Sequence, residues 1–417
     1  MAIDKKVLNV PHLRFPEFSE EWEICKVSEL LDFYSTNSLS WEQLEYGTKA
    51  IMNLHYGLIH VGLPTMVDLT RDNLPNIKED NMPKNFELCK EGDVAFADAS
   101  EDTNEVAKPI EFFDLAGKNI VCGLHTIHGR DNKNKTVIGF KGYAFSSSAF
   151  HNQIRRIAQG TKIYSISTKN FSECFIGIPS KVEQTKIATL LRLIDERIAT
   201  QNKIIEKYES LIKGLNDSLY KQYGNAITTS FADLGHSYSG LSGKSAEDFG
   251  SGKPFITYLN VYSNSVVNEN DYQYVRISDG EKQNVVKYGD VLFTLSSETP
   301  EEVGIGSIYL GKSDVYLNSF CFGIHITDTK VAFPPYLSYY VSSTPFRKFI
   351  YPYAQGSTRF NLCKADFEKA RIKIPSLENQ KRIYFILSHI ASKVKTETKL
   401  LDLFRLQKQS LLRQMFI

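Results

Sequence analysis

The sequence predicts an α+β chain made by tandem duplication of a β-rich domain. Each copy is followed by a long helix, and the two helices are expected to pair as an antiparallel coiled coil. Three observations predict this: the chain repeats itself at a spacing of 196 residues, each repeat holds short β-type runs, and each repeat closes on a heptad pattern. Because solenoid units are only about 20–50 residues long, this spacing indicates duplication of a whole module.

The repeat is clearest in two matching segments. "AQGTKIYSISTKNF" begins at Ala158, and "AQGSTRFNLCKADF" begins at Ala354. Upstream, "EGDVAFADAS" pairs with "YGDVLFTLSS", and downstream Gln184 falls on Gln380. The same order of elements is therefore expected in both halves.

Within each half, β-type runs such as "DVAFADA", "NIVCGLHTI", "DVLFTL" and "SIYLG" come first. A short helix is expected next, with Ser148 as the N-cap in the first copy and Thr344, before Pro345, in the second. A short strand ending in Ile-Pro leads into the long helix. The stretch "FGSGK" (residues 249–253) lacks a full phosphate-loop pattern and is interpreted as a loop.

The closing helices carry the heptad pattern, in which apolar residues recur at positions a and d. Gln201 and Glu397 are polar residues at matching a positions, which indicates a register device. Lys408 breaks the d pattern, so looser packing is expected toward the C-terminus. A long surface helix with a wide core-facing stripe is the alternative. The predicted interface residues are Ile187, Leu191, Ile194, Ile198, Gln201, Ile205, Tyr208, Ile212, Leu215, Ile383, Leu387, Ile390, Val394, Glu397, Leu401, Phe404 and Leu411.

Composition limits the class of protein. The chain has 49 Lys and Arg against 48 Asp and Glu, so any nucleic-acid binding must come from local basic patches. The six cysteines form no CxxC motif and are expected to be isolated buried thiols in a reducing cytosol. His125, His128 and His325 lack spaced acidic partners, so no metal site is predicted. The sequence shows neither a signal peptide nor a long apolar run, which predicts a cytoplasmic protein that does not enter a membrane.

The two helices also suggest a geometry. A helix of about 40 residues is roughly 60 Å long. An antiparallel pair of such helices would place one β-rich domain at each end, related by an approximate two-fold axis. Such a pseudo-symmetric arrangement suits duplex DNA, with one domain for each half-site.

Taken together, these features resemble the specificity (S) subunit of type I restriction-modification systems. The matching pieces are the "LRFPEFSEEWEICKVSEL" opening, each "GDV" strand, each "AQG[TS]" loop before a Phe and an Ile-Pro, and each "Q…I…L" helix. The resemblance covers the whole chain. It implies target-recognition domains at 1–180 and 223–375, with spacer helices at 181–222 and 376–417.

The resemblance also implies a division of labour. The two recognition domains would read the halves of a bipartite, asymmetric double-stranded DNA site, and the helices would set the spacing and dock two modification (methyltransferase) subunits. Restriction subunits would join through the complex. The S subunit itself would carry no catalytic residue, metal or cofactor, because S-adenosylmethionine, ATP and Mg²⁺ belong to the partner subunits.

The residues agree with a subunit that carries no active site. "AFPPYLSYY" contains Pro334-Pro335-Tyr336, but Phe333 stands where an adenine methyltransferase would need a polar residue. We interpret this stretch as a loop leading into a helix. A fused restriction-methylation enzyme and a coiled-coil scaffold that binds only proteins are the two alternatives.

The repeated loop and the helix before it are the predicted DNA contacts. Glycine allows close approach of the backbone, hydroxyl groups can donate to phosphate, and Lys and Arg supply charge. A phosphate could also lie at the start of the short helix, at Ser148 or Thr344. A structural turn kept in both copies is the alternative for the loop. The predicted DNA-binding residues are Arg155, Arg156, Gly160, Thr161, Lys162, Arg347, Lys348, Gly356, Ser357, Thr358 and Arg359.

Residues that differ between the copies are expected to carry specificity. The most divergent segments are 34–60 and 98–118 in the first half, and 236–265 and 296–306 in the second. They are rich in Asn, Ser, Thr, His and Tyr, which suits hydrogen bonding to base edges and suits ordinary surface loops equally.

Overall fold

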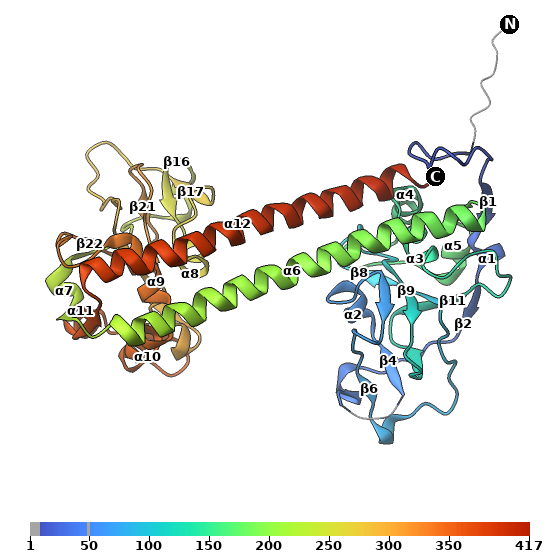
Figure 1. Cartoon of the computed structure of the whole chain (residues 1–417), viewed down its shortest axis with the longest axis horizontal. Helices are drawn as coiled ribbons and strands as arrows, with labels where there is room; N and C mark the ends of the chain where they lie inside the picture. Colours follow the sequence, from blue (N-terminus) through green and yellow to red (C-terminus); the bar gives the residue numbers. More distant parts are fainter. Residues whose placement is uncertain (1–8, 48–50) are drawn as a thin grey trace, which may run out of the picture. The chain divides into compact units, whose positions relative to one another are not determined.

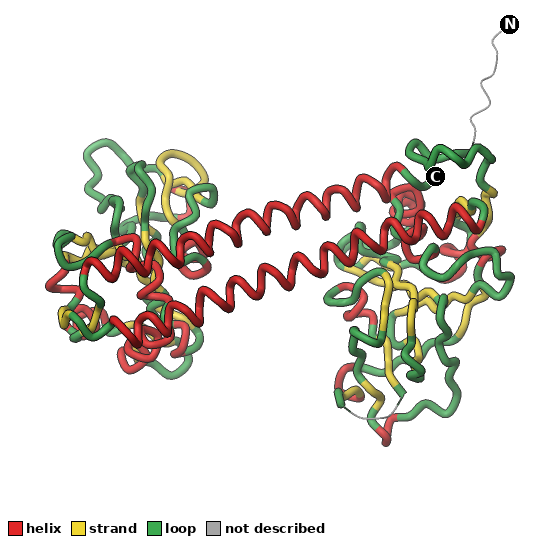
Figure 2. The backbone as a smooth tube through the Cα atoms, viewed as in Figure 1, coloured by secondary structure: helices red, strands yellow, loops and turns green. Residues whose placement is uncertain are grey.

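The computed structural model describes residues 9–47 and 51–417 (Figure 1). The chain divides into two compact units, the first comprising residues up to Asn202 with Lys399–Ile417, and the second Lys203–Thr398. Outside the long helices, each unit consists of short strands, short helices and many loops (Figure 2).

The first unit builds its core around a mixed five-stranded sheet in the order β2-β11-β7-β9-β5. A four-stranded sheet has the order β10-β4-β6-β3. The elements are β1 (Glu23–Lys26), α1 (Val27–Leu30), β2 (Asp32–Tyr34), β3 (Leu44–Glu45), β4 (Met52–Leu54), α2 (Tyr56–His60), β5 (Met66–Asp68), β6 (Asn76–Ile77), β7 (Val94–Ala97), β8 (Ala99–Ser100), β9 (Pro109–Asp114), β10 (Ile120–Cys122), β11 (Thr126–Arg130), α3 (Lys141–Phe145), α4 (Ser148–Ile157), β12 (Tyr164–Ser165), α5 (Thr168–Ser172) and β13 (Phe175–Ile178).

The second unit repeats this plan with sheets ordered β15-β22-β18-β20, β17-β16-β21 and β19-β24-β23. A two-stranded pair, β14-β25, corresponds to β1-β13 of the first unit. The elements are β14 (Ile227–Thr229), α7 (Phe231–Leu234), β15 (Gly235–Ser239), β16 (Phe249–Ile256), α8 (Tyr258–Ser263), β17 (Tyr272–Val275), β18 (Val291–Thr294), β19 (Ser296–Ser297), β20 (Gly306–Ile308), β21 (Tyr316–Leu317), β22 (Cys321–Ile326), α9 (Pro334–Ser342), α10 (Thr344–Ile350), β23 (Ala354–Gln355), β24 (Phe360–Leu362), α11 (Lys364–Lys369) and β25 (Ile372–Ile374).

Short 3₁₀ turns complete both units. They are η1 (Trp41–Gln43), η2 (Glu79–Asn81), η3 (Ala246–Asp248), η4 (Pro300–Glu302) and η5 (Tyr351–Tyr353).

The repeated glutamine joins each long helix to its own β-rich domain. Gln184 accepts from the backbone N–H of Val137 at 2.9 Å and donates to the carbonyls of Lys135 and Pro179. Gln380 makes the same three bonds, to Phe333, Val331 and Pro375. Because both side chains are fully buried, this clamp explains why both copies keep the glutamine.

The two long helices are α6 (Lys181–Tyr223) and α12 (Leu377–Gln414), and both are seen in Figure 1. In the second unit, Ile212 and Leu215 near the end of α6 pack in one cluster with Ile383 and Leu387 near the start of α12. In the first unit, the ammonium of Lys408 pairs with Asp195 at 2.6 Å. The helices are therefore antiparallel, which confirms the predicted fold class. All seventeen predicted interface residues are buried or half-buried.

Three local expectations were wrong. The N-caps are Ser147 and Ser343, one residue before those predicted, because their side chains accept from the backbone N–H three residues onward. Residues 249–253 are part of strand β16, where they pair with β17 through a bulge. Packing does not loosen near Lys408, since Leu411, Met415 and Phe416 join the core of the first unit.

The predicted recognition domains and spacer helices divide the chain by role. The two compact units divide it by contacts instead, and each long helix runs through both units. The predicted boundaries at 180, 222 and 375 therefore remain a prediction. Within the described residues, every helix is too short or too polar to cross a bilayer.

Candidate nucleic-acid interface

The repeated "AQG" loop is a tight turn held against a neighbouring strand in both units. In the first, β12 pairs with β8, and in the second, β24 pairs with β19. Gly160 and Gly356 have φ of 140° and 141°, and a Cβ on either would lie within about 2 Å of a carbonyl oxygen, 1.9 Å from that of Ile163 and 2.1 Å from that of Arg359. Only glycine fits this geometry, so a structural role explains both glycines.

A cleft of about 550 Å³ lies beside this loop in the first unit. It joins side chains from the two divergent segments of the first half, 34–60 and 98–118, to the loop residue Ile163. The lining residues are Tyr56, His60, Ala99, Ser100, Glu101, Asp102, Glu105, Lys108, His125 and Ile163.

Aromatic rings and hydrogen-bonding groups form the wall of this cleft. The ring of Tyr56 meets those of His60 and His125 edge to face, at centroid distances of 5.9 and 5.2 Å. His60 Nε2 lies 2.9 Å from the carbonyl oxygen of Ala99. His125 pairs with Asp98, and burial raises the pKa of that carboxyl although the histidine opposes the rise. Such a wall offers both stacking surfaces and hydrogen-bonding edges to a base.

The second unit places comparable residues at the matching positions. The rings of Tyr258 and Tyr262 in α8 stack with their centroids 5.9 Å apart. These residues match Tyr56 and His60 of α2, whose rings are also in contact. The phenol of Tyr262 donates to Glu302 at 2.7 Å, and this bond lowers the pKa of the carboxyl. The guanidinium carbon of Arg359 lies 6.0 Å from the centroid of the Phe320 ring. In the first unit, Ile163 stands at the position of Arg359 and His125 at that of Phe320. Thus the two sites share their position in the fold and differ in their side chains.

Ten of the eleven predicted DNA-binding residues are exposed, and the exception is Arg347. Its guanidinium donates to the carbonyls of Glu301, Val303 and Gly304, each at 2.7 Å. Burial lowers the pKa of Arg347. This arginine therefore holds the 301–304 loop, which lies next to the second site.

The helix starts differ from the predicted phosphate sites. The backbone N–H of Thr344 donates to Asp217 of α6 at 3.0 Å. A carboxylate already occupies the place expected for a phosphate, and it would repel one. At Ser148 the hydroxyl that caps the helix comes from Ser147.

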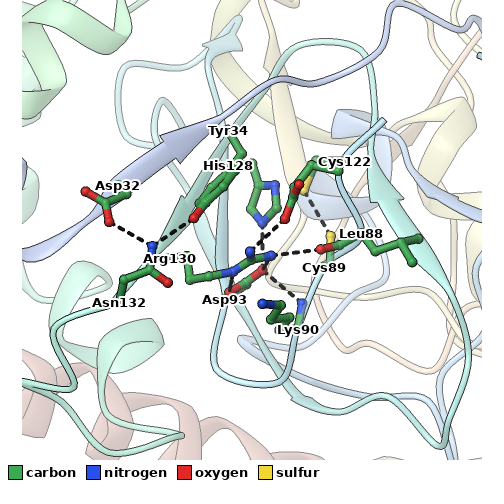
Figure 3. Close-up of polar contacts among 11 residues, drawn as sticks. Asp32, Tyr34, Leu88, Cys89, Lys90, Asp93, Cys122, His128, Arg130 and Asn132 are labelled. Atoms are coloured by element: carbon green, nitrogen blue, oxygen red, sulfur yellow. Dashed lines mark hydrogen bonds and ion pairs between the residues drawn. The ribbon is translucent and has the colours of Figure 1, made fainter. Parts of the chain in front are cut away.

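Each "GDV" aspartate holds a buried polar network that the sequence pattern did not predict. Asp93 accepts from His128 Nε2 at 2.7 Å and from Arg130 at 2.8 and 2.9 Å (Figure 3). Asp290 accepts from His325 Nδ1 at 2.8 Å and from Tyr238 at 2.7 Å. The expectation that these histidines lack acidic partners was wrong, because the paired strands supply an aspartate from 35 residues away in both units.

The titration of Asp93 reflects these partners. Burial raises its pKa, but hydrogen bonds from His128, Arg130 and the Lys90 backbone outweigh burial, so the net pKa is lowered. The carboxylate therefore stays ionised inside the core.

Two cysteines are not isolated, contrary to expectation. The sulfurs of Cys89 and Cys122 lie 3.6 Å apart beside His128 (Figure 3). Burial raises the pKa of the Cys89 thiol, as does its hydrogen bond with Cys122. Burial also disfavours the Cys122 thiolate, but the hydrogen bond from Cys89 and the neighbouring His128 lower its net pKa.

A family model matches much of the second unit. Residues 232–403 match the model of the type I restriction modification DNA specificity domain. The predicted resemblance to type I specificity subunits is confirmed. The matched region holds the second "GDV" and "AQG" segments and most of α12.

Known proteins are similar to this chain over nearly its whole length. A Methanocaldococcus jannaschii protein named as the MjaX type I restriction enzyme specificity subunit is 23% identical, over 95% of this chain and 91% of its own. The crystal structure of the type I S subunit from M. genitalium aligns at TM-score 0.51 and 15% identity, covering 98% of this chain and 99% of the other.

A further solved chain, from work on complex assembly and conformational transition of the type I R-M system, aligns at TM-score 0.58 and 16% identity. It covers 94% of this chain and 96% of the other. At these identities the two structures establish the shared fold.

Proposed function

We propose that this chain is the DNA-reading subunit of a type I restriction-modification complex, in which its two β-rich domains read the two halves of a bipartite, asymmetric site. The observation that carries this proposal is the cleft beside the repeated loop of the first unit, together with the different side chains at the matching positions of the second unit. The scaffold is equal in both copies, and the facing side chains differ, as expected for one fold that reads two different sequences.

Phosphate contact is assigned to the exposed basic residues around each loop. Arg155, Arg156 and Lys162 serve the first domain, and Lys348 and Arg359 serve the second. Backbone contacts position a protein on DNA and carry no sequence information directly, so exposed basic side chains beside the shared glycine turn suit this role. Arg347 is left out because backbone carbonyls already occupy its guanidinium.

The long helices are proposed to set the spacing of the half-sites and to dock two modification subunits, with restriction subunits joining through the complex. Exposed apolar side chains on the outer faces of the helices support the docking role. They are Leu193, Leu211, Phe385, Ile386, Leu400, Leu403 and Leu406. Methyl transfer and cleavage, with their cofactors, then belong to the partner subunits, and the complex acts on DNA in the cytoplasm.

Arg359→Ala tests the phosphate contact. In the reconstituted methyltransferase complex, the variant should bind all sites more weakly and reduce the slope of log K against log salt by about 1. Arg371→Ala is the matched control, because this exposed arginine pairs with Asp233 and lies outside the loop. Equal salt slopes for both variants and the wild type would contradict the assignment.

A further inference from the structure

A compact group of soft metal ligands lies inside the first unit. The ligand atoms of Cys89, Cys122 and His128 are all within 4.8 Å of one another. The side chains are 5%, 1% and 0% exposed, and none of them lines the cleft. The two sulfurs, 3.6 Å apart, are close to the separation of about 3.8 Å that two 2.3 Å bonds to one tetrahedral ion would give.

The orientation of the histidine is the second observation. Its Nε2–H donates to Asp93, which the backbone of Lys90 and the guanidinium of Arg130 hold in place. Among the described residues, nothing forms a hydrogen bond with the other ring nitrogen, Nδ1, which is fully buried. A carboxylate that holds one imidazole nitrogen and leaves the other free as a ligand is the usual support of a metal-bound histidine.

The second unit shows that the fold does not need these thiols. Strand pairing places Val286 where the first unit has Cys89, and Leu317 where it has Cys122. Both residues are fully buried and lie in one apolar cluster. The strand register also places Gly323 where the first unit has His128. The histidine that binds Asp290, His325, stands at the position of Arg130 instead. The thiols are therefore an addition to the first unit alone.

We propose that Cys89, Cys122 and His128 bind a soft d¹⁰ cation, Zn²⁺ or Cu⁺. Thiolate sulfur and imidazole nitrogen are the ligands that such ions prefer. Binding forms two metal–sulfur bonds and one metal–nitrogen bond, releases the thiol protons to solvent, and changes no oxidation state. The ion would fasten the segment before β7 to β10 and β11, and so stiffen the first domain.

A metal titration of the whole protein tests this site. The protein is stripped with a chelator under reducing, anaerobic conditions and then titrated with Zn²⁺ or, separately, Cu⁺. Metal retained after desalting is measured by atomic spectrometry, and Co²⁺ serves as a probe whose absorption reports thiolate ligation. One of the two ions should be retained at one equivalent per chain, and the Co²⁺ complex should show a sulfur-to-cobalt band.

The matched variant takes its residues from the second unit. Cys89→Val with Cys122→Leu should fold, by circular dichroism, and bind the ion at least tenfold more weakly. Cys363→Ser should bind as the wild type does, because Cys363 lies in the second unit. In the wild type, bound metal should protect Cys89 and Cys122 selectively from alkylation, a readout that does not depend on any variant. Failure of both ions to bind at one equivalent, or equal binding by the double variant, would overturn the proposal.

Discussion

A single repeated aspartate organises the interior of each β-rich domain. Asp93 and Asp290 both follow the glycine of "GDV", and both hold a histidine from the strand paired with their own. The two histidines are not equivalent, because the strand register matches His325 to Arg130. Arg130 completes the first network, and Tyr238 completes the second. The aspartate is shared because the scaffold needs an acceptor there, and its partners have diverged around it.

Asp93→Asn should lower the free energy of unfolding by about 3 kcal/mol, because it leaves His128 and Arg130 buried without a carboxylate. The exposed Asp80→Asn is the control. Urea denaturation at neutral pH measures both. A loss within experimental error of the control would contradict the role of this network.

The same variant has a defined pH dependence. The pKa of Asp93 is below its ordinary value of 3.8, so its ionised form stabilises the fold above that value. This contribution is lost as pH falls through the folded-state pKa. The stability difference between wild type and Asp93→Asn should therefore shrink below about pH 4. It should also shrink above about pH 6.5, because the Asp93 bond helps to raise the pKa of His128 and this contribution is lost as the imidazole deprotonates.

Residue partners were the hardest feature to predict from sequence. The exposed loop residues could be predicted because a repeated glycine with nearby Lys and Arg is a local pattern. The pairs Asp93–His128 and Arg347 with the 301–304 carbonyls join residues dozens of positions apart. Such contacts depend on which strands pair, and composition does not specify that.

Among the elements, the "AQG" turn has the tightest requirement. The Cβ of an alanine at Gly356 would lie 2.1 Å from the carbonyl oxygen of Arg359. Gly356→Ala should therefore destabilise the second unit by about 2 kcal/mol or more and weaken DNA binding.

Gly243→Ala separates the clash from backbone strain. Gly243 has φ of 65°, and apart from Gly243 and its two chain neighbours no atom in the part of the chain that the structure describes lies within 4 Å of the place its Cβ would take. This control should cost only about 1 kcal/mol, as expected for alanine in the left-handed region. Thermal unfolding of both variants gives the comparison, and equal losses would refute the clash.

The long helices were predicted well because a heptad pattern is local and periodic. The N-caps of the short helices α4 and α10 were misplaced by one residue, because each of these helices begins at two adjacent hydroxyl residues. They are Ser147 with Ser148 and Ser343 with Thr344. The prediction of a loop at 249–253 failed because glycine-rich sequence disfavours strands, whereas pairing with β17 outweighs that preference here.

For the chain as a whole, the proposed spacer role predicts a change in DNA spacing. Adding one heptad to α6 and one to α12, at matching levels of the seam, keeps the a and d pattern and lengthens each helix by about 10.5 Å. At about 3.4 Å per base pair, the preferred gap between half-sites should grow by about three base pairs. Selection from a library of DNA gaps measures this, and an unchanged gap would show that the helices do not set the spacing.

The duplication, the antiparallel helices and the resemblance to type I specificity subunits could all be predicted from the repeat. The cleft could not, because it forms only when segments near Tyr56, Ser100, His125 and Ile163 come together in the fold. The base sequence that this cleft would read depends on where its side chains lie against bound DNA.

The proposal that each β-rich domain reads one half-site can be decided by mapping methylated adenines in cells that carry this chain with its modification subunits. The map is then repeated after residues 1–180 are replaced with those of a relative of different specificity. We expect a bipartite motif in which one half changes and the other half, with its spacing, stays the same. A motif in which both halves change, or neither does, would contradict the proposal.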